Sequence, residues 1–213
     1  MKLDNRNYLY DLNSRSDRRE YTLINSLVSD GSTVIDLGCG DGTLLAIMKK
    51  RGIAGWGMDM SKSAAAASKK KGIKAITGRI DTSLPFKDKQ FDFAVCNVTL
   101  QMVVYPEILL SEMKRIAKKQ IVSFPNFAFI VNRLELLFYG RMPKTMIPGY
   151  DWYSTGHLHQ LSIADFEEFI KKRQLKILKR FYLYPKQKRF SENWFLFPNL
   201  LATEALYLLE ADE

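Results

Sequence analysis

The feature that most constrains the fold of this 213-residue chain is the stretch VIDLGCGDGTLL, residues 34–45. An apolar, strand-like segment ends in Asp36 and Leu37, three glycines follow at every second position, and TLLAIMKK then has the pattern of a helix. Glycines between a strand and a helix let a bound cofactor approach the backbone closely. The stretch therefore predicts an α/β sheet with a cofactor at the end of this strand.

The spacing and charge of the loop indicate the kind of cofactor. Its glycines, Gly38, Gly40 and Gly42, read GxGxG, whereas dinucleotide folds have GxGxxG and P-loops carry a lysine. Asp36 precedes the loop, where a carboxylate repels a pyrophosphate and attracts an ammonium or sulfonium group. The loop thus favours a cofactor with a positively charged, amino-acid-like end.

A second acidic residue supports a cofactor site. Asp59 ends the strand-like segment AGWGMD, about 20 residues beyond the loop, where a carboxylate commonly accepts hydrogen bonds from ribose hydroxyls. Asp36 and Asp59 both fall at carboxyl ends of predicted strands, which is where ligands bind in such sheets. The alternative is a tight strand–helix turn that holds no ligand.

Strand-like and helix-like segments alternate along the chain. Helices are predicted at 17–28, 43–52, 61–72, 106–119 and 162–173, and strands at 33–37, 54–59, 73–77, 91–98, 120–124 and 175–183, with a last apolar segment, EALYLLE, at 204–210. Repeated strand–helix pairs with apolar strands predict a doubly wound α/β sheet.

Residues 125–160 interrupt this rhythm with an amphipathic helix at 126–140 and an irregular stretch after it. An excursion of this length is typical of a functional cover or a binding surface. For the helix itself, simple packing across the end of the sheet is favoured over a lid or a docking surface for a partner enzyme.

Three motifs, VIDLGCGDGTLL, GMDMS and LPFKDKQFDFAV, resemble the successive motifs of class I S-adenosylmethionine-dependent methyltransferases. The resemblance implies one domain over residues 1–213, with a doubly wound, seven-stranded Rossmann-like sheet in the order 3-2-1-4-5-7-6. EALYLLE would be its antiparallel last strand, and residues 125–160 would be an insertion that covers the strand ends. S-adenosylmethionine would be the cofactor and S-adenosylhomocysteine the product.

The same resemblance implies a set of cofactor contacts. Asp36 and residues 38–42 would hold the methionine end and Asp59 the ribose; the candidate cofactor residues are Asp36, Gly38, Cys39, Gly40, Gly42, Asp59, Met60, Arg79, Ile80, Asp81 and Asn97. One position departs from the pattern. Where these enzymes have an Asp that accepts from the adenine amino group, this chain has Arg79, which has only donors. Asp81 or a backbone carbonyl would have to accept instead.

Later motifs narrow the resemblance. TLQ at 99–101, IVSFPNF at 121–127, GRMP at 140–143, YDWYSTGHLHQLSIADF at 150–166 and NLLA at 199–202 are similar to motifs of the methionine biosynthesis protein MetW family, over roughly residues 18–210. Membership implies a cytoplasmic bacterial protein that is linked to methionine biosynthesis and works alongside a homoserine O-acyltransferase. It identifies no methyl acceptor.

Three polar side chains are candidates for acting on a methyl acceptor: Gln101, Tyr153 and His159. Methyl transfer depends mainly on alignment, and a base is needed only where the acceptor must lose a proton. His159 is equally well explained as a general base or as a hydrogen-bonded structural residue. Gln101 is a substrate contact or a local loop cap, and Tyr153 a pocket wall or a packing anchor.

Two classes of function remain open from the sequence. One is an S-adenosylmethionine-dependent methyltransferase that acts on a small molecule, and the other is a non-catalytic, cofactor-sensing accessory subunit of a homoserine O-acyltransferase. The net charge of +9 leaves RNA methylation as a third, less favoured reading. Two cysteines and two histidines are too few to predict a zinc site. Without an apolar run of about 20 residues, no membrane partner is expected.

Overall fold

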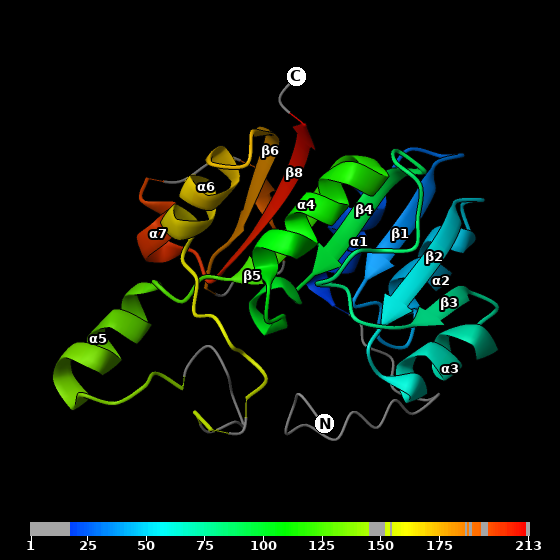
Figure 1. Ribbon diagram of the computed structural model, residues 1–213. Coiled ribbons are helices and arrows are strands. Elements are labelled where there is room, and N and C mark those ends of the chain that lie inside the picture. Colours follow the sequence, from blue (N-terminus) through cyan, green and yellow to red (C-terminus); the bar gives the residue numbers. More distant parts are fainter. Residues whose placement is uncertain are drawn as a thin grey trace.

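A computed structural model describes residues 18–144, 152–153, 155–185, 187, 189–192 and 196–211. Its strands form one sheet in the order β3-β2-β1-β4-β5-β8-β6-β7 (Figure 1). The strands are β1 (Thr33–Leu37), β2 (Ala54–Asp59), β3 (Lys74–Thr77), β4 (Phe91–Asn97), β5 (Ala117–Pro125), β6 (Leu175–Leu183), β7 (Ser191–Glu192) and β8 (Glu204–Ala211). Because β1 to β5 are parallel to one another, their carboxyl ends lie along one edge of the sheet.

The sheet confirms the predicted topology and corrects the strand count. β8, which contains EALYLLE, lies between β5 and β6 and runs antiparallel to both. Beyond β6 the sheet has an eighth strand, β7, which pairs with β6 through only two residues, Ser191 and Glu192. A strand of this length is too short to show the alternation by which strands are recognised in a sequence, so the prediction of seven strands missed it.

Helices cover both faces of the sheet (Figure 1). The helices of the described residues are α1 (Arg19–Leu27), α2 (Thr43–Lys49), α3 (Lys62–Lys70), α4 (Pro106–Ile116), α5 (Ile130–Tyr139), α6 (Ile163–Lys171) and α7 (Pro198–Leu201), with a 3-10 turn, η1, at Leu100–Met102. One apolar core contains Leu109 of α4 and Phe166 of α6, and a second contains Ile24 of α1 and Leu44 of α2. In the described part of the chain, no helix is long and apolar enough to cross a bilayer.

The boundary between α4 and β5 differs from the prediction. The helix ends at Ile116 instead of residue 119, and β5 begins at Ala117, which pairs with Phe91 of β4. The last predicted helical residues include Lys118, whose ammonium group instead forms an ion pair with Asp92 at 2.8 Å. Pairing with β4 therefore overrides the helical preference of these lysines.

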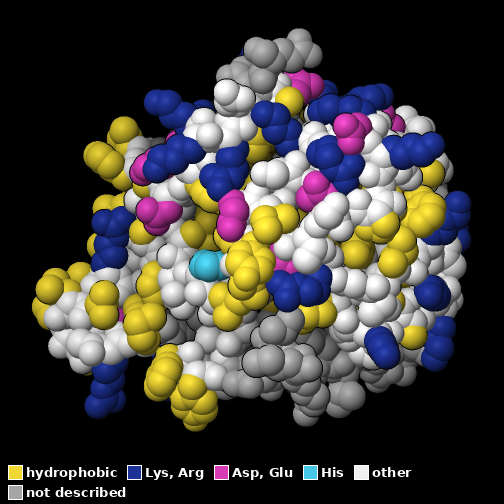
Figure 2. Space-filling view, in the orientation of Figure 1, with side chains coloured by type: hydrophobic (Ala, Val, Ile, Leu, Met, Phe, Trp, Pro, Cys, Tyr) yellow, Lys and Arg dark blue, Asp and Glu magenta, His cyan; other side chains and the backbone are white. Residues whose placement is uncertain are grey.

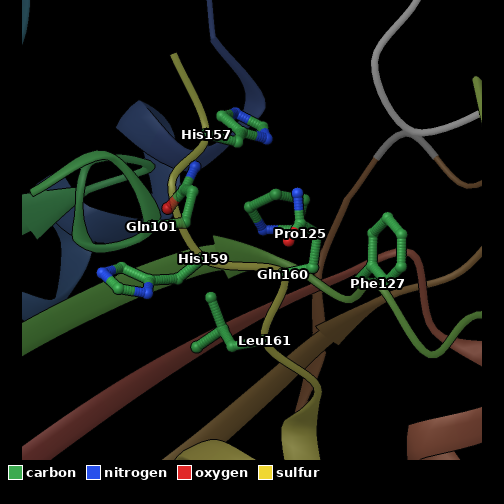
Figure 3. A pocket seen from close by; sticks show the side chains of 7 residues that line it. All are labelled: Gln101, Pro125, Phe127, His157, His159, Gln160 and Leu161. Atoms are coloured by element: carbon green, nitrogen blue, oxygen red, sulfur yellow. The ribbon is translucent and has the colours of Figure 1, made fainter. Parts of the chain in front are cut away.

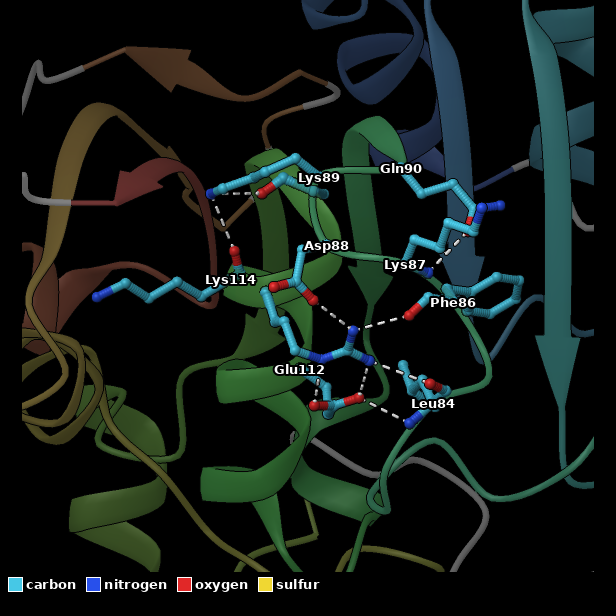
Figure 4. A network of polar contacts seen from close by, with 10 residues as sticks. Leu84, Phe86, Lys87, Asp88, Lys89, Gln90, Glu112 and Lys114 are labelled. Atoms are coloured by element: carbon cyan, nitrogen blue, oxygen red, sulfur yellow. Dashed lines mark hydrogen bonds and ion pairs between the residues drawn. The ribbon is translucent and has the colours of Figure 1, made fainter.

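A network around Arg115 fixes the loop that leads into β4 (Figure 4). The guanidinium group donates to the carboxylates of Glu112 and Asp88. It also donates to the carbonyl oxygens of Leu84 and Phe86. Arg115 thereby joins α4 to residues 84–88, which belong to the motif LPFKDKQFDFAV.

The bounds and packing of helix α5 differ from the prediction. It is shorter than the predicted helix at 126–140, and Asn132 is its only buried residue. Leu137 and Phe138 each expose 73% of their surface, and α5 projects away from the sheet (Figure 1). The expectation that this helix packs across the end of the sheet is therefore wrong. Residues 145–151 and 154 of the predicted insertion lie outside the described residues.

Candidate functional site

The glycine loop connects the carboxyl end of β1 to α2. Gly38, Gly40 and Gly42 all have positive φ angles, of 87°, 53° and 74°, which residues with a side chain rarely adopt. The Gly38 N–H donates to the carbonyl oxygen of Met58 at 2.8 Å. The Gly40 N–H donates to the carboxylate of Asp59 at 2.9 Å. The loop is thus held against the end of β2, as the motif order predicts.

The space beside Gly38 is filled by Thr99, which follows β4. A Cβ atom on Gly38 would lie 2.6 Å from both Cγ2 and Oγ1 of Thr99. The Thr99 hydroxyl in turn donates to the carbonyl oxygen of Asn97. Thr99 was not among the residues predicted for the site. The only available signal was its position in the TLQ motif.

Gly38→Ala is expected to destabilise the protein more than Gly31→Ala does. Both glycines have positive φ, but a Cβ on Gly31 would have no atom within 4 Å. Each substitution carries the cost of a left-handed alanine, about 1–2 kcal/mol, and the collision with Thr99 adds about 1–3 kcal/mol at Gly38. Urea denaturation of both variants measures the difference. Equal urea midpoints for the two variants would show that Thr99 moves aside without a loss of stability.

Asp36 is a buried carboxylate with an unused acceptor. Its side chain is 3% exposed, and Oδ1 has no hydrogen-bond partner among the described residues. Burial, and secondarily the charge of Asp59, raise the pKa of Asp36 to about 7, while Arg18 acts in the opposite direction. A buried carboxylate without a partner is costly unless a cation or donor approaches it. The end of β1 therefore fits a ligand with an ammonium group.

The Asp59 carboxylate binds both the glycine loop and the residues that follow β2. Its Oδ2 accepts from the Gly40 N–H, and its Oδ1 accepts from the Ser61 N–H at 2.8 Å. Burial raises the pKa of Asp59, and these two backbone donors oppose that shift. Since each carboxylate oxygen has two lone pairs, Asp59 can still accept from two ligand hydroxyls.

Arg79 and Asp81 form a local pair. The Arg79 guanidinium donates to both carboxylate oxygens of Asp81, at 3.1 and 3.0 Å. Asp81 also accepts from the backbone N–H groups of Val104 and Tyr105, directly before α4. Arg79, Val104 and Tyr105 hold the pKa of Asp81 below its usual value despite burial. Asp81 is thus already hydrogen-bonded, which favours a backbone carbonyl as the acceptor for an adenine amine.

The remaining predicted cofactor residues differ in their surroundings. Cys39 and Ile80 are buried, whereas Met60 is exposed. Asn97, at the end of β4, accepts from the hydroxyl of Ser123 at 2.6 Å. Ser123 lies on β5 and was not among the predicted site residues. Its hydrogen bond orients the Asn97 amide at the strand ends.

The three predicted acceptor-site residues are not all brought together. The backbone carbonyl of Gln101 accepts from the N–H groups of Leu158 and His159, so the segment after residue 155 lies against η1. His159 Nε2 is 3.0 Å from the carbonyl oxygen of Val103. Because a carbonyl oxygen only accepts, this nitrogen carries the proton. Tyr153 is exposed and contacts the Trp152 ring edge to face.

Comparison with known proteins shows the family to which the chain is similar. The family described as methionine biosynthesis protein MetW matches residues 18–209. A Rhodopirellula baltica protein, named bifunctional methionine biosynthesis protein MetXA/MetW, is 35% identical over 157 residues. The match covers 68% of this chain, and this chain spans a quarter (25%) of that relative's length.

Solved structures show the same fold. An S-adenosylmethionine-dependent methyltransferase from Thermotoga maritima has a TM-score of 0.69 at 19% identity, over 92% of this chain and 88% of its own. Magnesium protoporphyrin IX methyltransferase from Synechocystis PCC 6803, solved with S-adenosylhomocysteine bound, has a TM-score of 0.60 at 18% identity, over 90% and 81%. The chain therefore belongs to the methionine biosynthesis protein MetW family and has the class I methyltransferase fold.

Proposed function

We propose that this protein binds S-adenosylmethionine at the glycine loop and transfers its methyl group to a small molecule. The observation that carries the proposal is the unpartnered Oδ1 of buried Asp36, directly before three glycines with positive φ. An ammonium group is the partner that this carboxylate lacks, and the cofactor has one in its methionine end. Its sulfonium supplies an activated methyl group when it is bound.

The residues of the chain have separate parts in this proposal. Asp36 holds the ammonium group, the glycine loop allows the methionine end to approach the backbone, and Asp59 accepts from the ribose hydroxyls. Asn97 and Thr99 line the end of β4 next to the loop. The protein's contribution to the rate is alignment and the exclusion of water, since charge is dispersed as a methyl group leaves a sulfonium.

Calorimetry with S-adenosylmethionine and S-adenosylhomocysteine tests the binding step. Binding of both in the micromolar range is expected, and the failure of the wild-type protein to bind either at high micromolar concentration would remove the basis of the proposal. Transfer of labelled methyl groups to a metabolite extract then tests the chemical step.

Cofactor binding is expected to release a proton below neutral pH. Free Asp36 has a pKa of about 7, so it is largely protonated at pH 6, but it must be ionised to pair with an ammonium group. The affinity should therefore rise as the pH is raised towards about 7. Calorimetry at pH 6.3 in phosphate and in a buffer of high ionisation enthalpy detects the released proton, because the buffer that takes up this proton adds its own heat to the heat of binding. Equal heats in the two buffers would contradict the assignment.

The Asp36 carboxyl group also makes the unliganded protein less stable as the pH rises. Asp36 binds its proton more tightly when folded (pKa about 7) than at its ordinary value of 3.8, so its contribution to the unfolding free energy falls between these pH values. Burial also raises the pKa of Glu204 to about 7, and Asp36→Asn separates the two contributions because it removes only the first.

A second function is favoured by helix α5 and by the Rhodopirellula relative. The name of that relative joins MetXA and MetW in one bifunctional chain, which supports a homoserine O-acyltransferase as the partner of this protein. Leu134, Leu137, Phe138 and Tyr139 leave an apolar surface exposed on α5, and we assign the contact with the acyltransferase to this α5 surface. In this second function, cofactor binding changes the activity of the acyltransferase, and the methyl group stays on the cofactor.

The two functions make different predictions. A methyltransferase forms a labelled product without the acyltransferase, whereas an accessory subunit changes the acyltransferase rate when the cofactor is added and forms no labelled product.

RNA methylation gains no support from the face shown in Figure 2, where Lys and Arg side chains are dispersed and do not form one continuous stripe.

A further inference from the structure

Two cavities among the described residues differ greatly in size. Figure 3 shows the pocket beside Gln101, which has a volume of about 10 Å³ and therefore holds at most one water. A groove between α6 and α7 has a volume of about 620 Å³ and is open to solvent. This volume is within the range of sites that bind small organic molecules. We call this cavity the α6–α7 groove.

The α6–α7 groove lies on a face of the sheet, away from the glycine loop. Its lining includes Ile163 of α6, Pro198 and Leu200 of α7, and Arg180 and Tyr182 of β6. Because residues two apart on a strand share a face, Arg180 and Tyr182 both point to the side of the sheet that α6 covers. Three strands, β4, β5 and β8, lie between β6 and β1, which corresponds to about 19 Å at the usual spacing of neighbouring strands (Figure 1). The groove is therefore separate from the candidate cofactor site.

Arg180 is fixed in this groove through its Nε. The Nε donates to Oε1 of Glu167 at 2.9 Å, and the hydroxyl of the fully buried Tyr207 donates to the same oxygen at 3.0 Å. Neither terminal nitrogen of Arg180 has an acceptor in the part of the chain that the structure describes. An arginine that is held in this way presents its two terminal nitrogens as a fork, which is the geometry that matches a carboxylate.

Arg133, at the base of α5, is held in a similar way. Its Nε donates to the carbonyl oxygen of Ala128 at 2.6 Å, and one terminal nitrogen lies 3.4 Å from the carbonyl oxygen of Asn199. The charged side chains that line the groove are Arg133, Arg180 and Glu167, so the lining has a net charge of +1. A single positive charge favours a monoanion over a dianion such as a phosphate monoester.

Phe197 forms an apolar wall of the groove with a strained backbone. It directly precedes α7 and has a φ angle of 59°, in the left-handed region that bulky residues rarely adopt. It is 68% exposed although it lines the groove. Backbone strain of this kind clusters at ligand sites, where it holds a side chain in position. The groove thus combines a fixed guanidinium group with an exposed aromatic ring.

We propose that the α6–α7 groove binds a small organic molecule that has one carboxylate and an apolar body. The carboxylate accepts from the terminal nitrogens of Arg180, and Arg133 adds a second positive charge. The apolar body lies against Ile163, Leu200 and Phe197. Because Arg133 belongs to α5, the bound molecule also lies at the base of the projecting helix. The inference goes beyond the proposed function and does not depend on it.

Two probes with the same apolar body, 4-phenylbutanoate and 4-phenylbutanamide, test the role of the charge. Binding to the full chain is followed by nuclear magnetic resonance, with the backbone amides of Ala164 and Leu200 as reporters in the groove. The acid is expected to bind about 3- to 10-fold more tightly than the amide, because the contact is open to water and partly screened. This preference should shrink when the salt concentration is raised from about 0.05 to about 0.5 M. The amides of Gly38 and Gly40 should not shift.

Two results with the wild-type protein would overturn the inference. One is equal binding of the acid and the amide, and the other is a set of shifted amides that lies at the glycine loop instead of the groove. Neither measurement requires a variant that folds.

Arg180→Met removes the proposed partner of the carboxylate, and Lys172→Met is its matched control. Each cation forms an ion pair with a glutamate of α6, Arg180 with Glu167 and Lys172 with Glu168, but Lys172 does not line the groove. Arg180→Met should abolish the preference for the acid, because the lining then has no net charge, and Lys172→Met should keep it. A preference that survives Arg180→Met, or one that Lys172→Met abolishes equally, would show that the carboxylate does not bind in the groove.

Discussion

Asp59→Ala is expected to weaken the binding of S-adenosylmethionine by about 10- to 100-fold. The substitution removes the charged acceptor that we propose for the ribose hydroxyls, and a hydrogen bond to a charged group contributes about 1.5–3 kcal/mol. It also frees the Gly40 N–H, to which Asp59 Oδ2 is now bound at 2.9 Å. The loop then loses its hydrogen bond to the carboxylate at the end of β2, which adds to the loss of affinity. Calorimetry with the purified variant measures the effect.

Asp81→Ala is the matched control for this prediction. Asp81 is also a buried carboxylate near the strand ends, but its oxygens are bound by Arg79 and by the backbone of Val104 and Tyr105. Its loss should lower the melting temperature, because two N–H groups directly before α4 lose their acceptor, and should change the cofactor affinity by less than about threefold. A larger loss of affinity for Asp81→Ala than for Asp59→Ala would show that the ribose contact is misplaced.

The parts of the fold that could be predicted are those with a local signal. Strand β2 at Ala54–Asp59 and strand β6 at Leu175–Leu183 have the predicted bounds, because a run of suitable residues is bounded on both sides by turns or helices. Asp36 and Asp59 could be placed at strand ends because the motif order places them there. The two-residue β7 and the end of α4 could not be predicted, because pairing with a neighbouring strand decides where each of them lies.

The site contains contacts for which the sequence has no local signal. Thr99 fills the space beside Gly38 although it lies far along the chain from it, and the Ser123 hydroxyl of β5 donates to Asn97 on the adjacent strand β4. The pairing of Arg79 with Asp81 was also unforeseen. An Arg at this position indicated only that adenine recognition departs from the usual pattern, and the structure adds that Arg79 engages the acceptor that was expected to replace it.

Phe127 connects the segment around Leu161 to α5 through two hydrogen bonds. The Phe127 N–H donates to the carbonyl oxygen of Leu161, and the Phe127 carbonyl oxygen accepts from the Asn132 side chain on α5. Phe127 thus lies between the segment around Leu161 and the base of the projecting helix. A protein bound to α5 would therefore contact the helix that Phe127 joins to this segment.

The double substitution Leu137→Asp and Phe138→Asp is therefore expected to weaken binding of the homoserine O-acyltransferase by more than about 100-fold, because buried apolar anchors at interfaces each contribute about 2 kcal/mol or more. Both side chains are largely exposed, so the melting temperature should stay within a few degrees of the wild type. Ile108→Asp on α4, where the side chain is 38% exposed, is the control and should bind normally. Sedimentation velocity of the mixed proteins measures the complex. Absence of a complex with the wild type would refute the partner, whereas equal binding by the double variant would refute only the α5 surface.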